Sequence, residues 1–204
     1  MDDGAIPDAT IENGYPSMNV ILLGAPGAGK GTQGDILAGK ADLPIIATGD
    51  LLRATVKAGT LLGQQAQSYM DRGSLVPDEI ILGLIEEKLG SKEAGQGVIM
   101  DGFPRTIAQA EAVDGLLSSR GDQIDSVVAF EIPDEILIRR MIGRAGEEGR
   151  SDDTPDAIRK RLHVYREQTA PLLQFYEERG VATMVDATGS IDEVAARVAK
   201  AIPL

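Results

Sequence analysis

The sequence predicts an α/β protein with a five-stranded parallel sheet wrapped by helices. Five short apolar runs are separated by longer segments of helical periodicity, and they lie at 19–24, 44–48, 97–103, 126–132 and 182–188. Four of the five do not alternate apolar with polar residues, which is typical of parallel strands covered by helices on both faces. Strands and helices that alternate in this way form a doubly wound sheet, with ligands at the carboxyl ends of its strands.

Two of the intervening helices have clear starting signals. The segments 78–90 and 134–144 each follow a proline and begin with an aspartate, Asp78 or Asp134. An aspartate at the N-cap or in the first turn is favourable because the amino end of a helix is electropositive. Both segments are therefore predicted to be helices of the layers that cover the sheet.

Two stretches fit the alternation of strands and helices less well. Residues 49–76 contain two helical patterns and no strand, which is longer than a simple crossover needs. Residues 145–153 are glycine-rich, charged and poor in apolar side chains, as an ordinary surface loop would be. Because both stretches follow strands on the side where ligands bind, we expect them to form flaps over the site.

The composition excludes several classes of protein. The 204 residues are 43% hydrophobic, which suits one globular domain, and the net charge of −12 argues against a nucleic-acid or anionic-membrane surface. There is no cysteine for a disulfide or a thiolate metal site, and no run is long enough to span a membrane. Residues 1–17 hold four acids and no lysine or arginine, unlike a signal peptide. We expect a cytoplasmic protein with a flexible N-terminal extension.

The stretch "GAPGAGKGT", Gly24 to Thr32, carries the strongest chemical signal. It follows the first strand, precedes a helix and nearly fits the phosphate-binding pattern G-x-x-x-x-G-K-[ST], with Gly29 and Lys30 in place. Gly31 stands where the pattern has a hydroxyl for magnesium. Glycines let the loop aim backbone N–H groups at phosphate oxygens, and the lysine reaches the β and γ phosphates. These flanks favour phosphate binding over the alternative, a glycine-rich turn with a surface lysine.

The stretch "VIMDGFPRT" ends an apolar strand in Asp101. An aspartate at this position most often forms a turn or caps a helix. Beside a phosphate-binding loop it instead resembles the acid that holds magnesium, directly or through water.

Arginines are concentrated in residues 139–161. This segment contains seven arginine or lysine residues and five acidic ones, although the chain as a whole is acidic. Arg140 and Arg144 are four residues apart and share one face of a helix. Planar guanidinium groups suit phosphoryl transfer because they bind the equatorial oxygens on which charge accumulates. We therefore expect a cationic wall facing the loop. Ordinary surface positions are expected for Arg139, Arg159 and Lys160, and a structural role is expected for the single histidine, His163.

The chain resembles the adenylate kinases from Met18 to its C-terminus. The stretches "GAPGAGKGT", "TGDLLR", "DGFPRT", "RRMIGR" and "YREQTAPL" occur in the order and spacing of that family. The resemblance is to the bacterial type with a short lid, since about nine residues, 145–153, replace the long and sometimes zinc-binding lid. In this family a glycine normally follows the lysine, and magnesium is held largely through phosphate oxygens and waters. Gly31 is therefore the family form.

The resemblance implies a P-loop NTPase-like fold with an inserted helical AMP-binding lobe and a short lid. It divides the chain into a flexible extension at 1–17, a core at 18–46, 77–144 and 154–204, an AMP-binding lobe at 47–76 and a lid at 145–153. The implied cofactor is Mg²⁺ bound with ATP, without structural zinc. The implied partners are ATP, AMP and ADP, bound by a monomer.

The resemblance also implies roles for individual residues. The ATP site would consist of Gly27, Ala28, Gly29, Lys30, Gly31, Thr32 and Arg140, with Asp101 on the water shell of the metal. The AMP site would consist of Thr48, Arg53, Val76 (through its backbone), Gly102, Arg105 and Gln109, of which Gln109 would read the adenine edge. The residues that act on the transferring phosphoryl group would be Lys30, Arg105, Arg140, Arg144, Arg150 and Arg161.

The implied reaction is direct in-line transfer that interconverts ATP and AMP with two ADP and maintains adenine nucleotide balance. The nearest alternative is a UMP/CMP kinase on the same scaffold. Thr48 and Gln109 argue against it, because the pyrimidine relatives typically differ at both positions. A second alternative is an ATP-binding module without turnover. Retention of the arginines argues against that, since binding ATP alone needs no second phosphate clamp.

Overall fold

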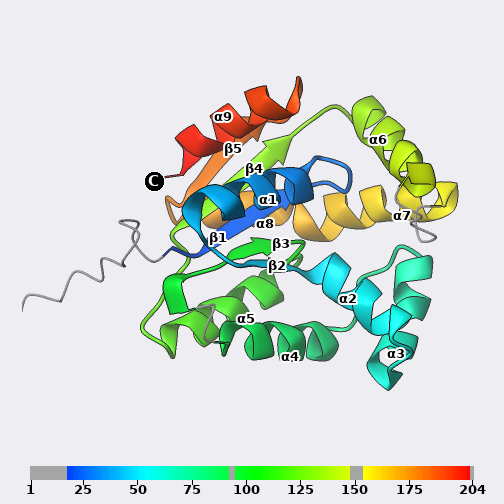
Figure 1. Ribbon diagram of the computed structural model, residues 1–204, viewed down its shortest axis with the longest axis horizontal. Coiled ribbons are helices and arrows are strands. Elements are labelled where there is room, and N and C mark those ends of the chain that lie inside the picture. Colours follow the sequence, from blue (N-terminus) through cyan, green and yellow to red (C-terminus); the bar gives the residue numbers. More distant parts are fainter. Residues whose placement is uncertain (1–17, 92–94, 148–153, 203–204) are drawn as a thin grey trace, which may run out of the picture.

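A five-stranded parallel sheet forms the centre of the molecule, in the strand order β2-β3-β1-β4-β5 (Figure 1). The structure, a computed structural model, describes residues 18–91, 95–147 and 154–202. The strands are β1 (Val20–Gly24), β2 (Ile45–Ala47), β3 (Ile99–Asp101), β4 (Ser126–Glu131) and β5 (Ala182–Asp186). Each lies inside one of the five predicted runs, so the predicted fold class is confirmed.

Helices connect successive strands and cover both faces of the sheet (Figure 1). They are α1 (Lys30–Ala41), α2 (Thr48–Lys57), α3 (Leu61–Asp71), α4 (Asp78–Leu89), α5 (Ile107–Ser118), α6 (Asp134–Glu147), α7 (Pro155–Val164), α8 (Pro171–Glu177) and α9 (Ile191–Ala201). A π-helical turn, η2 (Tyr165–Thr169), continues α7 toward α8. No helix in these described ranges is long and apolar enough to cross a membrane.

The core has one half on each face of the sheet. Along β1, Ile21 and Leu23 pack with α2, α3, α4, α5 and α8, whereas Val20 and Leu22 pack with α1, α6, α7 and α9. Burial on both faces explains why the central strands are continuously apolar. The edge strands β2 and β5 are partly exposed, and Met184 on β5 is 53% exposed. The prediction of four strands buried on both faces therefore holds for the three central ones.

The predicted helix starts are confirmed, because Asp78 and Asp134 lie in the first turns of α4 and α6. Residues 49–76, which were predicted to hold two helices and no strand, contain α3 and all but the first residue of α2. Helix α6 extends three residues beyond the predicted end, through Glu147, and so into the segment interpreted as a lid. The rest of that segment, 148–153, lies outside the described residues.

Helices α2 and α3 approach each other closely enough that one position requires glycine. A β-carbon added at Gly63 would lie 2.1 Å from the carbonyl oxygen of Thr55 and 2.6 Å from the backbone nitrogen of Val56. Both contacts are with backbone, which has little freedom to move aside. Gly63 therefore fixes the distance between these two helices, which stand beside the carboxyl end of β2 (Figure 1).

Replacing this glycine should destabilise the fold. We expect Gly63→Ala to lower the free energy of unfolding by about 1–3 kcal/mol, the usual cost of overpacking, as measured by urea unfolding followed by circular dichroism. The matched control is Gly83→Ala on α4, where an added β-carbon meets nothing within 4 Å. It should raise stability by roughly 0.5–1 kcal/mol, because glycine is a poor helix former. Equal stability of the two variants would contradict the close approach of α2 and α3.

Candidate active site

The site lies at the carboxyl edge of the sheet, as is usual for a doubly wound fold. β1 ends in Gly24, where the glycine loop begins, and its neighbour β3 ends in Asp101. The parallel register pairs Asp101 with Leu22, so the carboxylate lies beside the base of the loop. On the other side of β3, Thr48 follows the end of β2. The strand order thus brings together three motifs that are far apart in the sequence.

The glycine loop has the geometry of a phosphate-binding turn. Gly27 and Gly29 have φ angles of +85° and +95°, in the left-handed region that other residues rarely adopt. A β-carbon at Gly27 would also lie 3.0 Å from the carbonyl oxygen of Leu137. Gly29 is the N-cap of α1 and provides no side-chain cap. The amino end of this helix therefore keeps backbone donors and a positive dipole for an anion.

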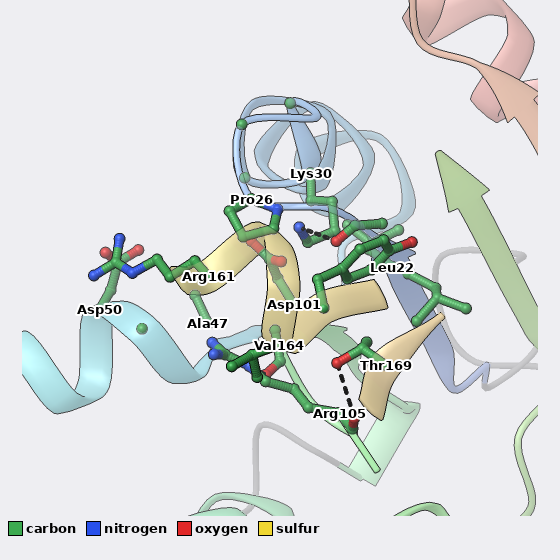
Figure 2. A pocket seen from close by; sticks show the side chains of 18 of the residues that line it. Leu22, Pro26, Lys30, Ala47, Asp50, Asp101, Arg105, Arg161, Val164 and Thr169 are labelled. Atoms are coloured by element: carbon green, nitrogen blue, oxygen red, sulfur yellow. Dashed lines mark hydrogen bonds between the residues drawn. The ribbon is translucent and has the colours of Figure 1, made fainter. Parts of the chain in front are cut away.

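The side chain of Lys30 lies across the glycine loop. Its Nζ donates hydrogen bonds to the carbonyl oxygens of Gly24, at 2.8 Å, and Ala25, at 3.1 Å. Figure 2 shows the ammonium group at the wall of the cavity, above Asp101. The lysine side chain is thus already held over the loop that is predicted to bind phosphates.

Gly31 faces the strand-end acid without a side chain between them. A β-carbon at Gly31 would lie 3.6 Å from Oδ2 of Asp101, so a threonine there would fill the space next to the carboxylate. No group of three or more acidic, histidine or cysteine side chains in the described ranges could hold a metal ion. A cation at Asp101 would therefore need further oxygen ligands from a bound phosphate and from water. The residues present fit magnesium that arrives with a nucleotide.

Two cavities adjoin at this edge of the sheet. The larger, about 350 Å³, is lined by the glycine loop and by Asp101, Arg140, Arg161 and Tyr165, among others (Figure 2). The smaller, about 80 Å³, is lined by all six residues predicted to contact AMP, which are Thr48, Arg53, Val76, Gly102, Arg105 and Gln109. Three of these six, Arg53, Gly102 and Arg105, also line the larger cavity.

Three arginines line both cavities. Arg53 comes from α2, Arg105 from the loop after β3, and Arg161 from α7. Burial lowers the pKa of the Arg105 guanidinium from its ordinary value, and the carboxylate of Asp101 opposes this shift. The positive charges of Arg161 and Arg53 lower it further. The junction between the cavities thus carries three guanidinium groups, with Asp101 and the Arg53 partner Asp50 as counter-charges, and this arrangement suits anions.

Arg105 is held at three points. Its Nε donates to the carbonyl oxygen of Gly102 at 2.6 Å, and its backbone nitrogen donates to Oε1 of Gln109 at 2.7 Å. Its carbonyl oxygen accepts a hydrogen bond from Oγ1 of Thr169 at 2.8 Å, which is drawn in Figure 2. These bonds fix both the backbone and the direction of the guanidinium.

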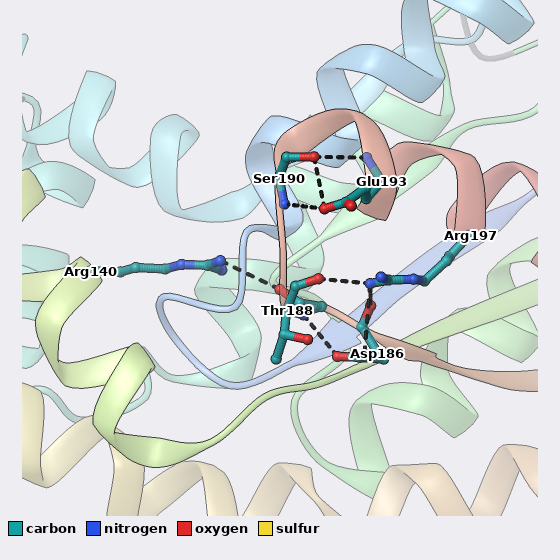
Figure 3. Close-up of polar contacts among 7 residues, drawn as sticks. Arg140, Asp186, Thr188, Ser190, Glu193 and Arg197 are labelled. Atoms are coloured by element: carbon teal, nitrogen blue, oxygen red, sulfur yellow. Dashed lines mark hydrogen bonds and ion pairs between the residues drawn. The ribbon is translucent and has the colours of Figure 1, made fainter.

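Arg140 reaches from α6 to two loops. Its guanidinium donates at 3.4 Å to the carbonyl oxygen of Ala28 in the glycine loop. It also donates at 3.4 Å to the carbonyl oxygen of Ala187 after β5, and this contact is drawn in Figure 3. The loop after β5 is in turn held by Arg197, which donates at 2.7 Å to the carbonyl oxygens of Asp186 and Thr188. Arg140 thus forms one wall of the larger cavity.

The other predicted cationic residues fall into three groups. Arg161 lines both cavities, whereas Arg139, Arg159 and Lys160 are exposed, as expected. Arg144 lies one turn beyond Arg140 on α6, and its side chain is not among those described. Arg150 lies outside the described residues. His163 is exposed and pairs with Glu167 at 3.2 Å, away from the cavities, in keeping with the structural role expected for it.

Within the predicted ATP set, the loop residues do not all face the cavity. Gly27, Gly29, Lys30, Gly31 and Thr32 line it, but Ala28 is buried and its backbone nitrogen donates to the carbonyl oxygen of Ala25 at 3.1 Å. Ala28 therefore stabilises the turn of the loop and does not line the cavity.

Two residues that support the site were not predicted to do so. Asp78 was expected only to start a helix, yet its Oδ1 accepts a hydrogen bond from Nε2 of Gln109 at 2.5 Å. Thr169, in the "YREQT" stretch, holds the backbone of Arg105. Both contacts join segments distant in the sequence, 31 and 64 residues apart, so no local pattern could reveal them.

A glycine loop and a nearby acid on a parallel sheet, with a second cavity behind a cluster of arginines, are the features of a P-loop phosphotransferase. A family model described as "Adenylate kinase" matches residues 22–181. The chain is 50% identical over 185 residues to the adenylate kinases of Stenotrophomonas maltophilia (strain K279a) and Xanthomonas euvesicatoria pv. vesicatoria (strain 85-10). Each match covers 91% of this chain and 99% of the relative.

The chain belongs to the adenylate kinase family. Its reaction is the phosphoryl transfer of that family, ATP + AMP = 2 ADP, and the family generally uses ATP with magnesium. The resemblance found in the sequence motifs is thereby confirmed over most of the chain.

The hydroxyl of Thr48 gives a direct test of the structure at the smaller cavity. Thr48 is buried, and its Oγ1 donates to the carbonyl oxygens of Gly102, at 2.9 Å, and Asp101, at 3.3 Å. Thr48→Val keeps the shape but leaves these carbonyls without their donor. We expect a loss of about 1–2 kcal/mol in unfolding free energy and a higher KM for AMP, with the KM for ATP little changed.

The matched control is Thr183→Val, on the exposed surface of β5. It should alter stability by less than about 0.5 kcal/mol and leave both KM values unchanged. Wild-type stability of Thr48→Val in urea unfolding would show that its hydroxyl does not join the ends of β2 and β3.

Proposed function

We propose that the larger cavity holds MgATP, that the smaller holds AMP, and that their phosphates meet at Arg53, Arg105 and Arg161. One observation carries the proposal: these three guanidinium groups line both cavities. Two polyanions repel each other, so a direct transfer between them needs fixed positive charge at their meeting point.

On the ATP side, the glycine loop supplies the phosphate contacts. The backbone of residues 27–32 and the amino end of α1 bind the phosphates, and Lys30 turns from its carbonyl partners to the phosphate oxygens. Arg140 closes the wall of this cavity, since it already contacts the loop.

Magnesium accompanies the ATP phosphates, with Asp101 supporting it through water. The ion supplies charge neutralisation for the phosphate oxygens. Asp101 suits this role because its carboxylate borders the open space at Gly31. That space would accommodate the ion's bound waters, which a side chain at position 31 would displace.

On the AMP side, the lining of the smaller cavity includes both arginines and uncharged residues. Arg53 and Arg105 bind the phosphate, and the backbones of Gly102 and Val76 line the space for the nucleoside. Gln109 reads the edge of the adenine. Thr48 stabilises this pocket through its hydrogen bond to the carbonyl oxygen of Gly102, directly after β3.

The transfer itself needs no general base. An oxygen of the AMP phosphate is already an anion, and it attacks the γ-phosphorus of ATP in line with the bond to the leaving β-phosphate oxygen. That bond breaks as the new P–O bond forms, which leaves ADP in both cavities. Lys30, Arg105, Arg140 and Arg161, with Arg144 and Arg150 from the lid side, neutralise the charge on the transferring group. Positioning and electrostatics thus carry the catalysis.

The segments 47–76 and 145–153 act in this proposal as the AMP-binding lobe and the lid. Their closure excludes water, which would otherwise accept the phosphoryl group. The same proposal includes a monomer, a lid without zinc and action in the cytoplasm. The chain contains no cysteine for a thiolate zinc site, which supports the second of these.

The guanidinium of Arg105 is the most direct target for testing this arrangement. Arg105→Lys keeps one positive charge but loses the planar fork and the hydrogen bond from Nε to Gly102. We expect kcat to fall at least about 100-fold, because a single arginine can contribute 10³-fold or more to such a transfer. Arg159→Lys, at an exposed surface position, is the control and should retain full activity. Turnover of Arg105→Lys near that of the wild type would rule out its proposed role.

The choice of monophosphate separates this proposal from its rivals. The purified protein should form diphosphates rapidly from MgATP and AMP, and at least about tenfold more slowly with CMP or UMP, as followed by phosphorus NMR. A preference for CMP or UMP would overturn the roles given to Thr48 and Gln109. ATP binding without any transfer would instead support a binding module.

A further inference from the structure

The side-chain amide of Gln109 is locked in one orientation. Gln109 is buried, with 2% of its surface exposed, and it lines the smaller cavity. Its Oε1 accepts from the backbone nitrogen of Arg105 at 2.7 Å, and its Nε2 donates to Oδ1 of Asp78 at 2.5 Å. The two ends of the amide are therefore bound by different elements, the loop after β3 and the first turn of α4.

The chemistry of these partners fixes which end of the amide is which. A backbone N–H such as that of Arg105 can only donate, so the atom it contacts must be the amide oxygen. An ionised carboxylate can only accept, so the atom facing Asp78 must be the amide nitrogen. Two independent contacts thus give the same assignment, which does not depend on seeing hydrogen atoms.

The locked amide has one donor and one acceptor left for a ligand. A primary amide has two N–H groups and two oxygen lone pairs, and one of each is already used. The remaining pair suits a base edge that presents an amino group beside an unprotonated ring nitrogen, as adenine does. A 6-oxo purine presents the opposite order, an oxygen beside a protonated nitrogen. A freely rotating amide could flip to bind either edge, whereas a locked one cannot.

We propose that Asp78 is a positioning residue for substrate specificity: by holding the amide of Gln109 it selects 6-amino over 6-oxo purine monophosphates. This inference rests on the proposed function, in which Gln109 reads the base. Asp78 acts through Gln109. Its hydrogen bond is charge-assisted and therefore among the stronger ones that a neutral amide can make.

The probes are AMP and inosine monophosphate, which differ only in the 6-amino or 6-oxo group and the N1 proton. The readout is the ratio of kcat/KM for AMP to that for inosine monophosphate, with MgATP as donor. Asp78→Ala removes the acceptor, so this ratio should fall roughly tenfold, the effect of losing one charge-assisted hydrogen bond. Asp78→Asn keeps an acceptor oxygen and should retain most of the discrimination. The KM for ATP should not change.

A neighbouring residue gives the matched control. Glu79 is also an acid in the first turn of α4 and is exposed, so Glu79→Ala removes the same favourable charge from the start of the helix. It should leave the ratio at its wild-type value. An equal fall in Glu79→Ala and Asp78→Ala would overturn the inference, since helix stability alone would then explain both. A fall in Asp78→Asn as large as that in Asp78→Ala would overturn it as well.

Gln109→Ala separates this inference from the proposed function. If this variant keeps the wild-type ratio, Gln109 does not read the base and both proposals for it fail. If Gln109→Ala lowers the ratio but Asp78→Ala does not, the base-reading role stands and the positioning role of Asp78 is overturned. A fall in both variants supports the two together.

Discussion

Three guanidinium groups share the junction of the two cavities, and their mutual repulsion is the constraint on which the rest of the site depends. Arg105 shows it most clearly, because burial and two neighbouring arginines all disfavour its charged form. Two carboxylates partly compensate these charges: Asp101 acts on Arg105, and Asp50 forms an ion pair with Arg53. In the proposed function, bound phosphate groups add negative charge at this junction, so the same arginines favour the binding of two anions side by side.

Among these three arginines, Arg105 is held in place by hydrogen bonds from three segments of the chain. Arg105 is bound through Gly102, Gln109 and Thr169, so its side chain contacts the loop after β3 and its backbone contacts the helix α5 and the turn η2. The amide of Gln109 extends this network to Asp78 at the start of α4. One continuous set of hydrogen bonds therefore joins Arg105, which is proposed to bind the AMP phosphate, to Gln109, which is proposed to read the base.

The sequence predicts the strands and the glycine loop because their signals are local: apolar runs for the strands, and glycines with a lysine for the loop. The sequence does not predict features that depend on contacts between segments distant in the chain. Four of the five runs read as buried on both faces, but only the three central strands are, and Met184 on β5 is exposed because an edge strand has a neighbouring strand on one side only. The contacts of Asp78 with Gln109 and of Thr169 with Arg105 are not predicted for the same reason, since these partners lie 31 and 64 residues away. The motif residues could be assigned to two ligands from the family resemblance, but only the fold shows that Arg53, Arg105 and Arg161 border both cavities.

The most direct test of the central claim is a crystal structure of the protein with AMP and a non-hydrolysable analogue of MgATP. The account predicts the ATP analogue on the glycine loop and AMP in the smaller cavity, with its base at Gln109. The γ-phosphate and the AMP phosphate should both contact guanidinium groups of Arg53, Arg105 and Arg161. AMP bound elsewhere, or two nucleotides whose phosphates do not meet at these arginines, would contradict it.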